Sequence, residues 1–277
     1  MMRRSGGFSL IELIVALTIS VVVVGFIATF IAVPVRAHVA QARRGELSAS
    51  AETLARAIAE DVRTALPGSP RAYIANGRVV LELIPVLGVV RYCDIVGVDC
   101  PDRLDFAVAD SQFDVIEDSQ NVAASFVVVT DNDPTDAVSA QDAYGLTNTI
   151  ARAQDTTGHL VTLQAPPFLF LDRSPNNRAF FVSDVTRYEC DTNARTLRRF
   201  ANVALPAGVG PAPIGAASDV IARDVTACRF TFVPAPAPPR QPQNGGLVVV
   251  EITISRVTDG VAENLRVVRQ LRLEHTA

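Results

Sequence analysis

The N-terminal segment constrains this chain more than any other part of its sequence. Glu12 is the only charged residue between Arg4 and Arg36, and Arg3 stands beside Arg4 at the start. The apolar run over 8–35 would form a helix about 42 Å long, whereas the hydrocarbon core of a bilayer is about 30 Å thick. The run can therefore cross a membrane. A carboxylate inside it costs about 2.5 kcal/mol or more unless it finds a partner, so we interpret Glu12 as a functional residue.

The stretch Gly7-Phe8-Ser9-Leu10-Ile11-Glu12 resembles the class III signal of type IV pilins and of the pseudopilins of type II secretion. In that family a basic leader ends in glycine, and a prepilin peptidase cuts before the next residue and methylates the new amino group. The resemblance implies a leader over 1–7, cleavage between Gly7 and Phe8, and N-methylation of Phe8. It also implies that Glu12 is the assembly carboxylate, compensated by the α-amino group of Phe8 on a neighbouring subunit.

Two other interpretations of the N-terminus stay open. An ordinary secretory signal peptide would end at Ala40-Gln41-Ala42 and leave a mature chain that begins at Arg43. A plain single-span anchor would place Glu12 near the lipid headgroups. The length of the apolar run and the acid inside it argue against the signal peptide. In all three interpretations the leader arginines stay in the cytoplasm and the bulk of the chain is exported.

Beyond the apolar run, the sequence predicts that the helix continues as an amphipathic segment. Pro34 should kink or loosen it locally, and the prolines and glycine of 66–70 should end it. We therefore predict an N-terminal helix over 8–66, with a transmembrane part over 8–35 and an amphipathic part over 36–66. The apolar stripe of the second part has spacings of three and four and consists of Leu47, Ala51, Leu54, Ile58, Val62 and Leu66.

The remainder, over 67–277, reads as one β-rich globular domain. No alternation of strands and helices appears, so we predict an α+β fold in which the long N-terminal helix packs on an antiparallel sheet, as in pilins. A short helical turn is expected within 218–228. The expected strands are 79–84, 86–92, 125–130, 159–164, 168–171 and 229–233, with hairpins formed by 179–190 with 194–200 and by 247–255 with 263–273.

Four cysteines, an even number, occur in a chain that we expect to enter an oxidising compartment. Of the three possible pairings we favour Cys93–Cys100 and Cys190–Cys228, and free buried thiols are the alternative. A metal site is less favoured, because there is no C-x-x-C motif and none of the three histidines is near a cysteine.

Three segments of the C-terminal half narrow the resemblance to two groups of minor subunits. They are Arg187-Tyr188-Glu189-Cys190-Asp191, then Thr196-Leu197-Arg198-Arg199-Phe200, then Val225-Thr226-Ala227-Cys228-Arg229-Phe230. Their order resembles the O minor pilin of mannose-sensitive haemagglutinin (MSHA) pilus biogenesis, and is also similar to the J minor pseudopilin of type II secretion. Residues 100–175 match nothing in either group. In these families the minor subunits are low-copy components that prime assembly or occupy the filament tip.

No catalytic or cofactor site emerges from the sequence, so we predict neither enzymatic activity nor a cofactor. There is no G-x-S-x-G, no Walker A loop and no G-x-G-x-x-G. Asp131, Asp133 and Asp136 form the one patch that could hold a calcium ion, although a solvated turn is the better interpretation. The net charge of −4 provides no basic tract, so nucleic acid is not an expected partner.

The sequence thus predicts a structural subunit, a minor pilin or pseudopilin of the inner membrane with a periplasmic domain that later enters a pilus or pseudopilus. Its expected partners are the prepilin peptidase, other major and minor pilins or pseudopilins, the inner-membrane assembly platform and membrane lipid. The alternatives are an exported enzyme on a plain anchor, and a filament adhesin or DNA-uptake subunit. For the latter only Arg195, Arg198 and Arg199 offer a basic cluster.

Overall fold

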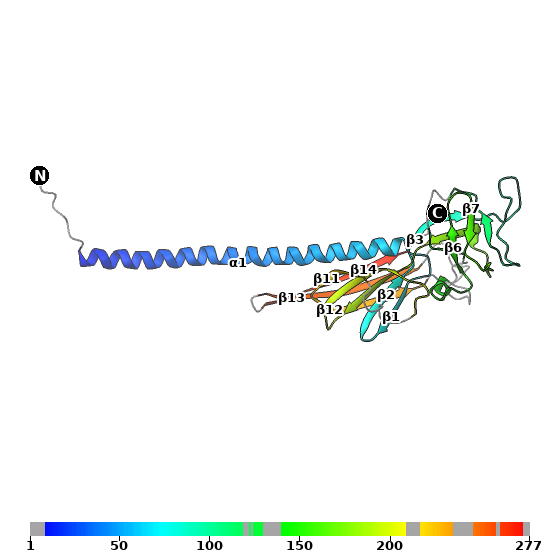
Figure 1. Cartoon of the computed structure of the whole chain (residues 1–277). Coiled ribbons are helices and arrows are strands. Elements are labelled where there is room, and N and C mark those ends of the chain that lie inside the picture. Colours follow the sequence, from blue (N-terminus) through cyan, green and yellow to red (C-terminus); the bar gives the residue numbers. More distant parts are fainter. Residues whose placement is uncertain are drawn as a thin grey trace. The chain divides into compact units, whose positions relative to one another are not determined.

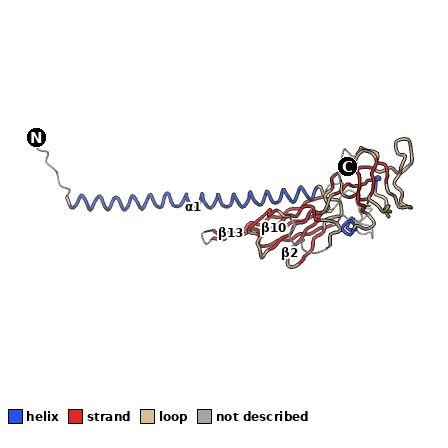
Figure 2. Tube along the Cα trace, viewed as in Figure 1, coloured by secondary structure: helices blue, strands red, loops and turns tan. Residues whose placement is uncertain are grey.

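The chain has an α+β architecture in which one long helix precedes antiparallel sheets (Figures 1 and 2). The computed structural model describes residues 9–118, 122, 124–129, 140–208, 217–234, 246–258 and 261–273. Two compact units make up the chain, Met1–Ala49 and Ser50–Ala277. The first contains most of the long helix, and the second contains the end of that helix together with all the strands.

Helix α1 spans Leu10–Arg63 and ends three residues before the predicted boundary. The earlier end has a local cause, since the N–H of Leu66 donates to the carbonyl of Ile84 (2.7 Å) and Ala65 pairs with Pro85 in an isolated bridge. The chain has therefore already entered sheet pairing at these positions. The helix is unbroken through Pro34, where the sequence favoured a kink or local loosening.

Within the second unit, the apolar stripe of α1 is buried as the spacing predicted, at Ala51, Leu54, Ile58 and Val62. A polar contact fixes the same turn of the helix to the sheet. The Asp61 carboxylate accepts two N–H bonds from the Arg199 guanidinium, at 2.7 and 3.1 Å, and a hydroxyl bond from Tyr188. We call these three side chains the helix clamp.

The second unit contains a five-stranded sheet, which carries the clamp residues Tyr188 and Arg199, and a three-stranded sheet. The five-stranded sheet has the order β1-β2-β9-β10-β11 and the three-stranded sheet the order β12-β13-β14, and all described pairings in them are antiparallel. Asn76 and Gly77, both with positive φ, form the tight turn between β1 and β2. The strands are β1 Arg71–Ala75, β2 Arg78–Leu83, β9 Val185–Asp191, β10 Thr196–Val203, β11 Asp219–Arg223, β12 Val225–Val233, β13 Leu247–Thr258 and β14 Val261–Arg272.

A third, six-stranded sheet is inserted between β2 and β9, which are themselves neighbours in the five-stranded sheet. Its order is β3-β8-β5-β6-β7-β4, and it contains most of the region 100–175 that resembled no family. The strands are β3 Val86–Arg91, β4 Gln112–Asp114, β5 Phe126–Val128, β6 Ile150–Asp155, β7 Leu160–Leu163 and β8 Arg178–Val182, and two short 3-10 helices accompany them, η1 Ala140–Gly145 and η2 Pro175–Asn177.

The inserted sheet is buried on both faces, which explains the continuous apolar runs of β5 and β8. Phe126 and Phe180 face a core that also contains Val185 and Phe200 of the five-stranded sheet. The alternate residues Val127 and Phe181 face a second core inside the insertion. Successive side chains of a strand point to opposite faces, so each strand supplies both cores.

Several strand predictions need correction. Residues 168–171 form no strand, and Phe168 makes only an isolated bridge with Asp110. The segment 179–190 is divided between β8 and β9, and 218–228 holds β11 and the start of β12 instead of a helical turn. Because β11 pairs with β10, a tertiary partner decides its conformation. Strands β1, β4 and β6 were not predicted, since they are short or carry few β-branched side chains.

Candidate functional site

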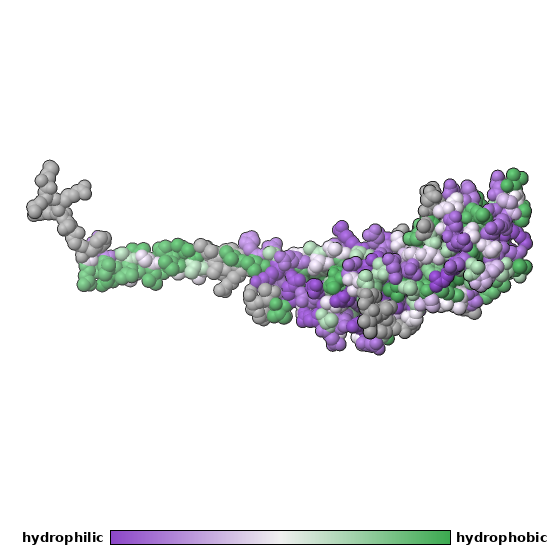
Figure 3. All heavy atoms as spheres, viewed as in Figure 1, coloured by the Kyte–Doolittle hydropathy of each residue, from purple (hydrophilic) through white to green (hydrophobic). Residues whose placement is uncertain are grey.

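The beginning of α1 exposes apolar side chains on every side. Within the described residues, Leu10–Phe30 is one helical segment long and apolar enough to cross a membrane, judged by its length and composition (Figure 3). The hydroxyl of Thr18 donates to the carbonyls of Ile14 and Val15 in its own helix, which satisfies a polar group that lipid could not. These features suggest that the segment anchors the chain in a membrane.

Glu12 lies in the first turn of this helix. Its N–H donates to the carbonyl of Ser9 at 3.0 Å, and the N–H of Leu13 donates to the same oxygen at 3.1 Å. The Glu12 side chain is exposed and, among the described residues, has no ion pair. A carboxylate at this end of a helix lies near the positive end of the macrodipole.

The other residues of the predicted signal lie outside the described part of the chain. They are the leader residues Arg3 and Arg4 and the cleavage-site residues Gly7 and Phe8. Their cleavage, methylation and pairing with Glu12 therefore stay predictions. The calcium candidates Asp131, Asp133 and Asp136 also lie outside it, and within the described residues no three His, Cys, Asp or Glu side chains are grouped to hold a metal ion.

The structure has two disulfides, Cys93–Cys100 and Cys190–Cys228, which is the pairing favoured from the sequence. The first closes a short loop after β3. The second joins β9 to β12 and so links the five-stranded sheet to the three-stranded sheet. All four cysteines of the chain are used in these bonds.

The arginines of β10 and its preceding turn do not form one basic face. Arg199 turns inward to the helix clamp. Arg198, on the opposite face of the strand, donates to the hydroxyl of Ser218 at 3.0 Å, and Arg195 donates to the carbonyl of Ser255. Each guanidinium therefore has a local structural partner, which weakens the interpretation of this cluster as a DNA-binding patch.

A buried charge cluster in the five-stranded sheet escaped the sequence analysis. The fully buried Glu82 accepts bonds from Arg71 (2.5 Å), Tyr73 (3.0 Å) and Arg187. Arg71 also lies over the ring of Tyr144, 3.6 Å from its centroid, and burial raises the pKa of that phenol well above its ordinary value. The one available signal was an acid within the apolar run of β2. Within the described residues, Nη1 of the buried Arg187 has no hydrogen-bond partner and lies 3.8 Å from the Glu189 carboxylate. Because Glu82 pairs with both guanidinium groups, we interpret the cluster as structural.

Comparison with known proteins locates similarity at the N-terminus. Residues 2–28 match the family described as "Prokaryotic N-terminal methylation motif", a range that includes Gly7, Phe8 and Glu12. No curated protein matches the chain. No solved structure matches it either. The motif supports a type IV pilin-like family and hence a pilin or pseudopilin subunit, and a signal of this class implies processing by prepilin peptidase and assembly with other pilins.

Proposed function

We propose that this chain is a minor pilin or minor pseudopilin, a structural subunit that primes or caps assembly of a membrane-anchored filament. The observation that carries the proposal is the methylation motif over 2–28 at the start of an exposed apolar helix that leads into an α+β unit. Prepilin peptidase would cut between Gly7 and Phe8 and methylate Phe8.

The position of Glu12 supports its role as the assembly carboxylate. After cleavage it would be the fifth residue of the mature chain, on the first turn of α1 and surrounded by apolar side chains. In lipid or in a filament core such a charge needs a counter-charge, and the α-amino group of Phe8 on a neighbouring subunit can supply one. That pairing would also fix the axial offset between two subunits.

For the filament system we favour a type IV pilus of the MSHA kind, with a type II secretion pseudopilus as the alternative. The segments that carry this resemblance lie on β9, β10 and β12, where Cys190 and Cys228 form a disulfide. The partners would be the other pilins or pseudopilins, the assembly platform and membrane lipid. The chain would cross the inner membrane once, with its C-terminal domain in the periplasm before assembly.

The decisive experiment is the intact mass and N-terminal peptide of the protein purified from its native membrane. We expect a chain that begins at N-methylated Phe8. A chain that begins at Arg43 would indicate a conventional signal peptide and would overturn the proposal. An uncut chain would indicate a plain anchor and would overturn it as well.

Substitutions separate processing from assembly. Gly7→Val should leave the leader uncut, because the peptidase acts next to this glycine. Glu12→Ala should be cut normally but fail to assemble. Glu60→Ala is the matched control, since Glu60 is an exposed acid further along the same helix and should assemble normally. Efficient filament formation or secretion by Glu12→Ala would contradict the assigned role.

A further inference from the structure

The loop closed by the Cys93–Cys100 disulfide exposes an unusual amount of aliphatic surface. Ile95, Val96 and Val98 are 79, 60 and 99% exposed, although the same sheet buries most of its aliphatic residues in two cores. Scattered apolar side chains on a surface need no explanation, but three within four positions of one short loop form a patch of the kind that marks interaction sites. We call residues 93–102 the apolar tip.

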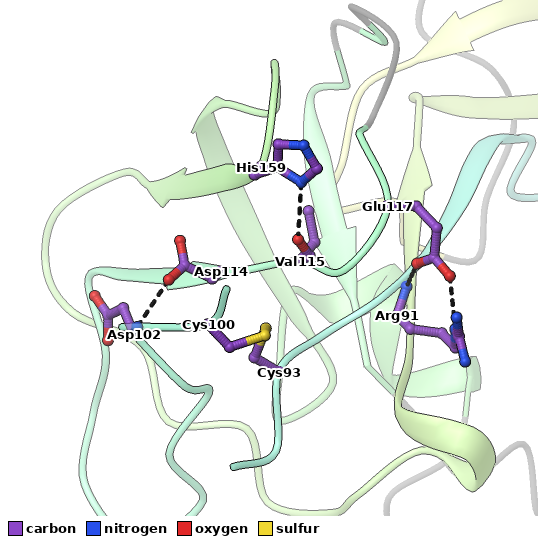
Figure 4. The surroundings of a disulfide bond; sticks show 8 residues. All are labelled: Arg91, Cys93, Cys100, Asp102, Asp114, Val115, Glu117 and His159. Carbon is purple, nitrogen blue, oxygen red and sulfur yellow. Dashed lines mark hydrogen bonds and ion pairs between the residues drawn. A yellow bond between two sulfur atoms is a disulfide. The ribbon is translucent and has the colours of Figure 1, made fainter. Parts of the chain in front are cut away.

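The tip is held in a fixed shape. Besides the disulfide, Gly97 and Cys100 exchange two backbone hydrogen bonds (2.9 and 3.3 Å). Cys93 is buried, and its N–H donates to the carbonyl of Asp114 at 2.9 Å. The Asp114 carboxylate in turn accepts the N–H of Asp102 at 2.7 Å (Figure 4). A loop that is rigid before binding loses little conformational freedom when a partner covers it.

Neighbouring segments support the tip from the side. Asp94 forms an ion pair with Arg173, whose guanidinium lies 4.9 Å from the centre of the Phe106 ring. Val108 and Leu171, each two residues from one of these contacts, are also exposed. The tip is therefore held against neighbouring segments of the inserted region.

The charges of the tip indicate the chemistry of its partner. Residues 93–102 contain three carboxylates, Asp94, Asp99 and Asp102, and no cation. Asp94 is compensated by its ion pair with Arg173, which leaves Asp99 and Asp102 as the net charges of the tip. Two carboxylates beside an aliphatic centre repel phosphate groups, which disfavours nucleic acid and anionic lipid. This arrangement complements an apolar pocket with a basic rim, a surface that proteins provide.

The tip also has a defined place within its own compact unit. Within Ser50–Ala277, the inserted sheet lies at the end where α1 finishes, away from Ser50 (Figure 1). Ser50 is where this unit connects to the segment that we assign to the membrane. The tip follows β3 of the inserted sheet and so belongs to that end of its own unit.

We infer that the apolar tip is a preformed docking site for another, non-identical subunit of the same filament, which contributes an apolar pocket with a basic rim. The inference rests on the proposed function, because that function is what makes a co-assembling subunit available. Ile95, Val96 and Val98 enter the pocket, and Asp99 faces its basic rim.

The test is photocrosslinking of the full chain in its native cells, with p-benzoylphenylalanine in place of Val98. Ile74 on β1, which is 75% exposed, is the matched control position. We expect an adduct at position 98, at least tenfold above that at position 74, with a different protein whose own N-terminus is an N-methylated residue. Asp99→Arg should reduce this adduct at least fivefold, whereas the control Asp219→Arg on exposed β11 should leave it within twofold.

Other outcomes would overturn the inference. They are an adduct with a second copy of this chain, an adduct with lipid alone, and a yield at position 98 no higher than at position 74. The N-terminal peptide of the same sample separates the two proposals. If the chain begins at methylated Phe8 and no subunit adduct forms, only the docking inference fails. If it begins elsewhere, the proposed function fails.

Discussion

The helix clamp should contribute strongly to the unfolding free energy by holding α1 on the five-stranded sheet. The substitution Asp61→Ala tests this. The Asp61 and Arg199 side chains are 19 and 29% exposed, so their bidentate pair is only partly screened by solvent. Tyr188 is fully buried, and burial followed by the charge of Asp61 raises the pKa of its phenol, which therefore stays protonated and donates. Asp61→Ala removes this acceptor from Arg199 and leaves the Tyr188 hydroxyl, among the described residues, with only the long contact to the carbonyl of Ala57, at 3.4 Å.

The expected loss follows from the bonds that are removed. Hydrogen bonds to charged groups contribute about 1.5–3 kcal/mol, and a buried donor left unsatisfied costs about 1–3 kcal/mol. Partial exposure of the ion pair places the total for Asp61→Ala at about 3 kcal/mol of unfolding free energy. Tyr188→Phe removes one hydroxyl and should cost about 1 kcal/mol. Asp61 and Arg199 should show a coupling energy of about 1–2 kcal/mol in a double-mutant cycle.

The assay is urea unfolding of the full chain in detergent micelles, followed by far-ultraviolet circular dichroism. The matched control is Glu52→Ala, which removes the exposed ion pairs of Glu52 with Arg269 on β14 (2.9 Å) and with Arg56 on α1 (3.2 Å). The control should change stability little, because solvent screens both pairs. Equal losses for Asp61→Ala and Glu52→Ala, or additive effects of Asp61 and Arg199 substitutions, would refute the reasoning.

Three further predictions concern stability in the same unit. Replacing Cys190–Cys228 by a pair of serines should lower the unfolding free energy by about 4 kcal/mol, and the same change at Cys93–Cys100 should lower it by about 2.5 kcal/mol. The first loss is larger because that disulfide closes the longer loop, with a sequence separation of 38 against 7. Urea unfolding of each variant measures both losses, and the reverse order would contradict the loop-entropy argument. Glu82→Ala should cost about 3–5 kcal/mol by leaving the buried Arg187 and the partly buried Arg71 without this carboxylate, and a loss below about 1 kcal/mol would mean that water reaches the cluster. Hydrogen bonds from the N–H of Ala194 and then from Arg78 lower the pKa of Asp191 in the folded state. The stabilisation that the Asp191 carboxylate provides is therefore present above the unfolded pKa of about 3.9 and is lost as the pH falls through the folded pKa. The stability difference between the wild type and Asp191→Asn should shrink on acidification, and a constant difference would contradict this.

The sequence predicted those features whose causes are local. The spacing of Leu54, Ile58 and Val62 sufficed for the buried stripe of α1, since a helix presents positions three and four apart on one face. The apolar run over 8–35 and the residues around Glu12 were enough to indicate a membrane helix and its signal. The α+β class followed from the absence of alternating strands and helices.

Features that depend on distant partners could not be predicted in this way. Residue 61 appears in the sequence only as a polar position on α1, and nothing in its neighbourhood indicates Arg199 on β10 as its partner. The buried Glu82 is likewise intelligible only once β1, β2 and β9 are adjacent. The segment 218–228 was predicted to hold a helical turn for the same reason. Its extended conformation depends on the pairing of β11 with β10, which the local sequence does not indicate.

The inserted sheet is a part of the fold that can vary without loss of the rest. β2 and β9 pair in register from Val79 with Cys190 to Leu83 with Thr186, although the whole six-stranded sheet lies between them in the sequence. The entropy of closing a loop grows only slowly with its length, so a long insertion at this position is tolerated once it has its own core. The helix clamp and the five-stranded sheet include no strand of the insertion, so its surface can change without loss of either. We therefore expect subunits that share this architecture to differ in their partners through the inserted sheet, and above all through the apolar tip.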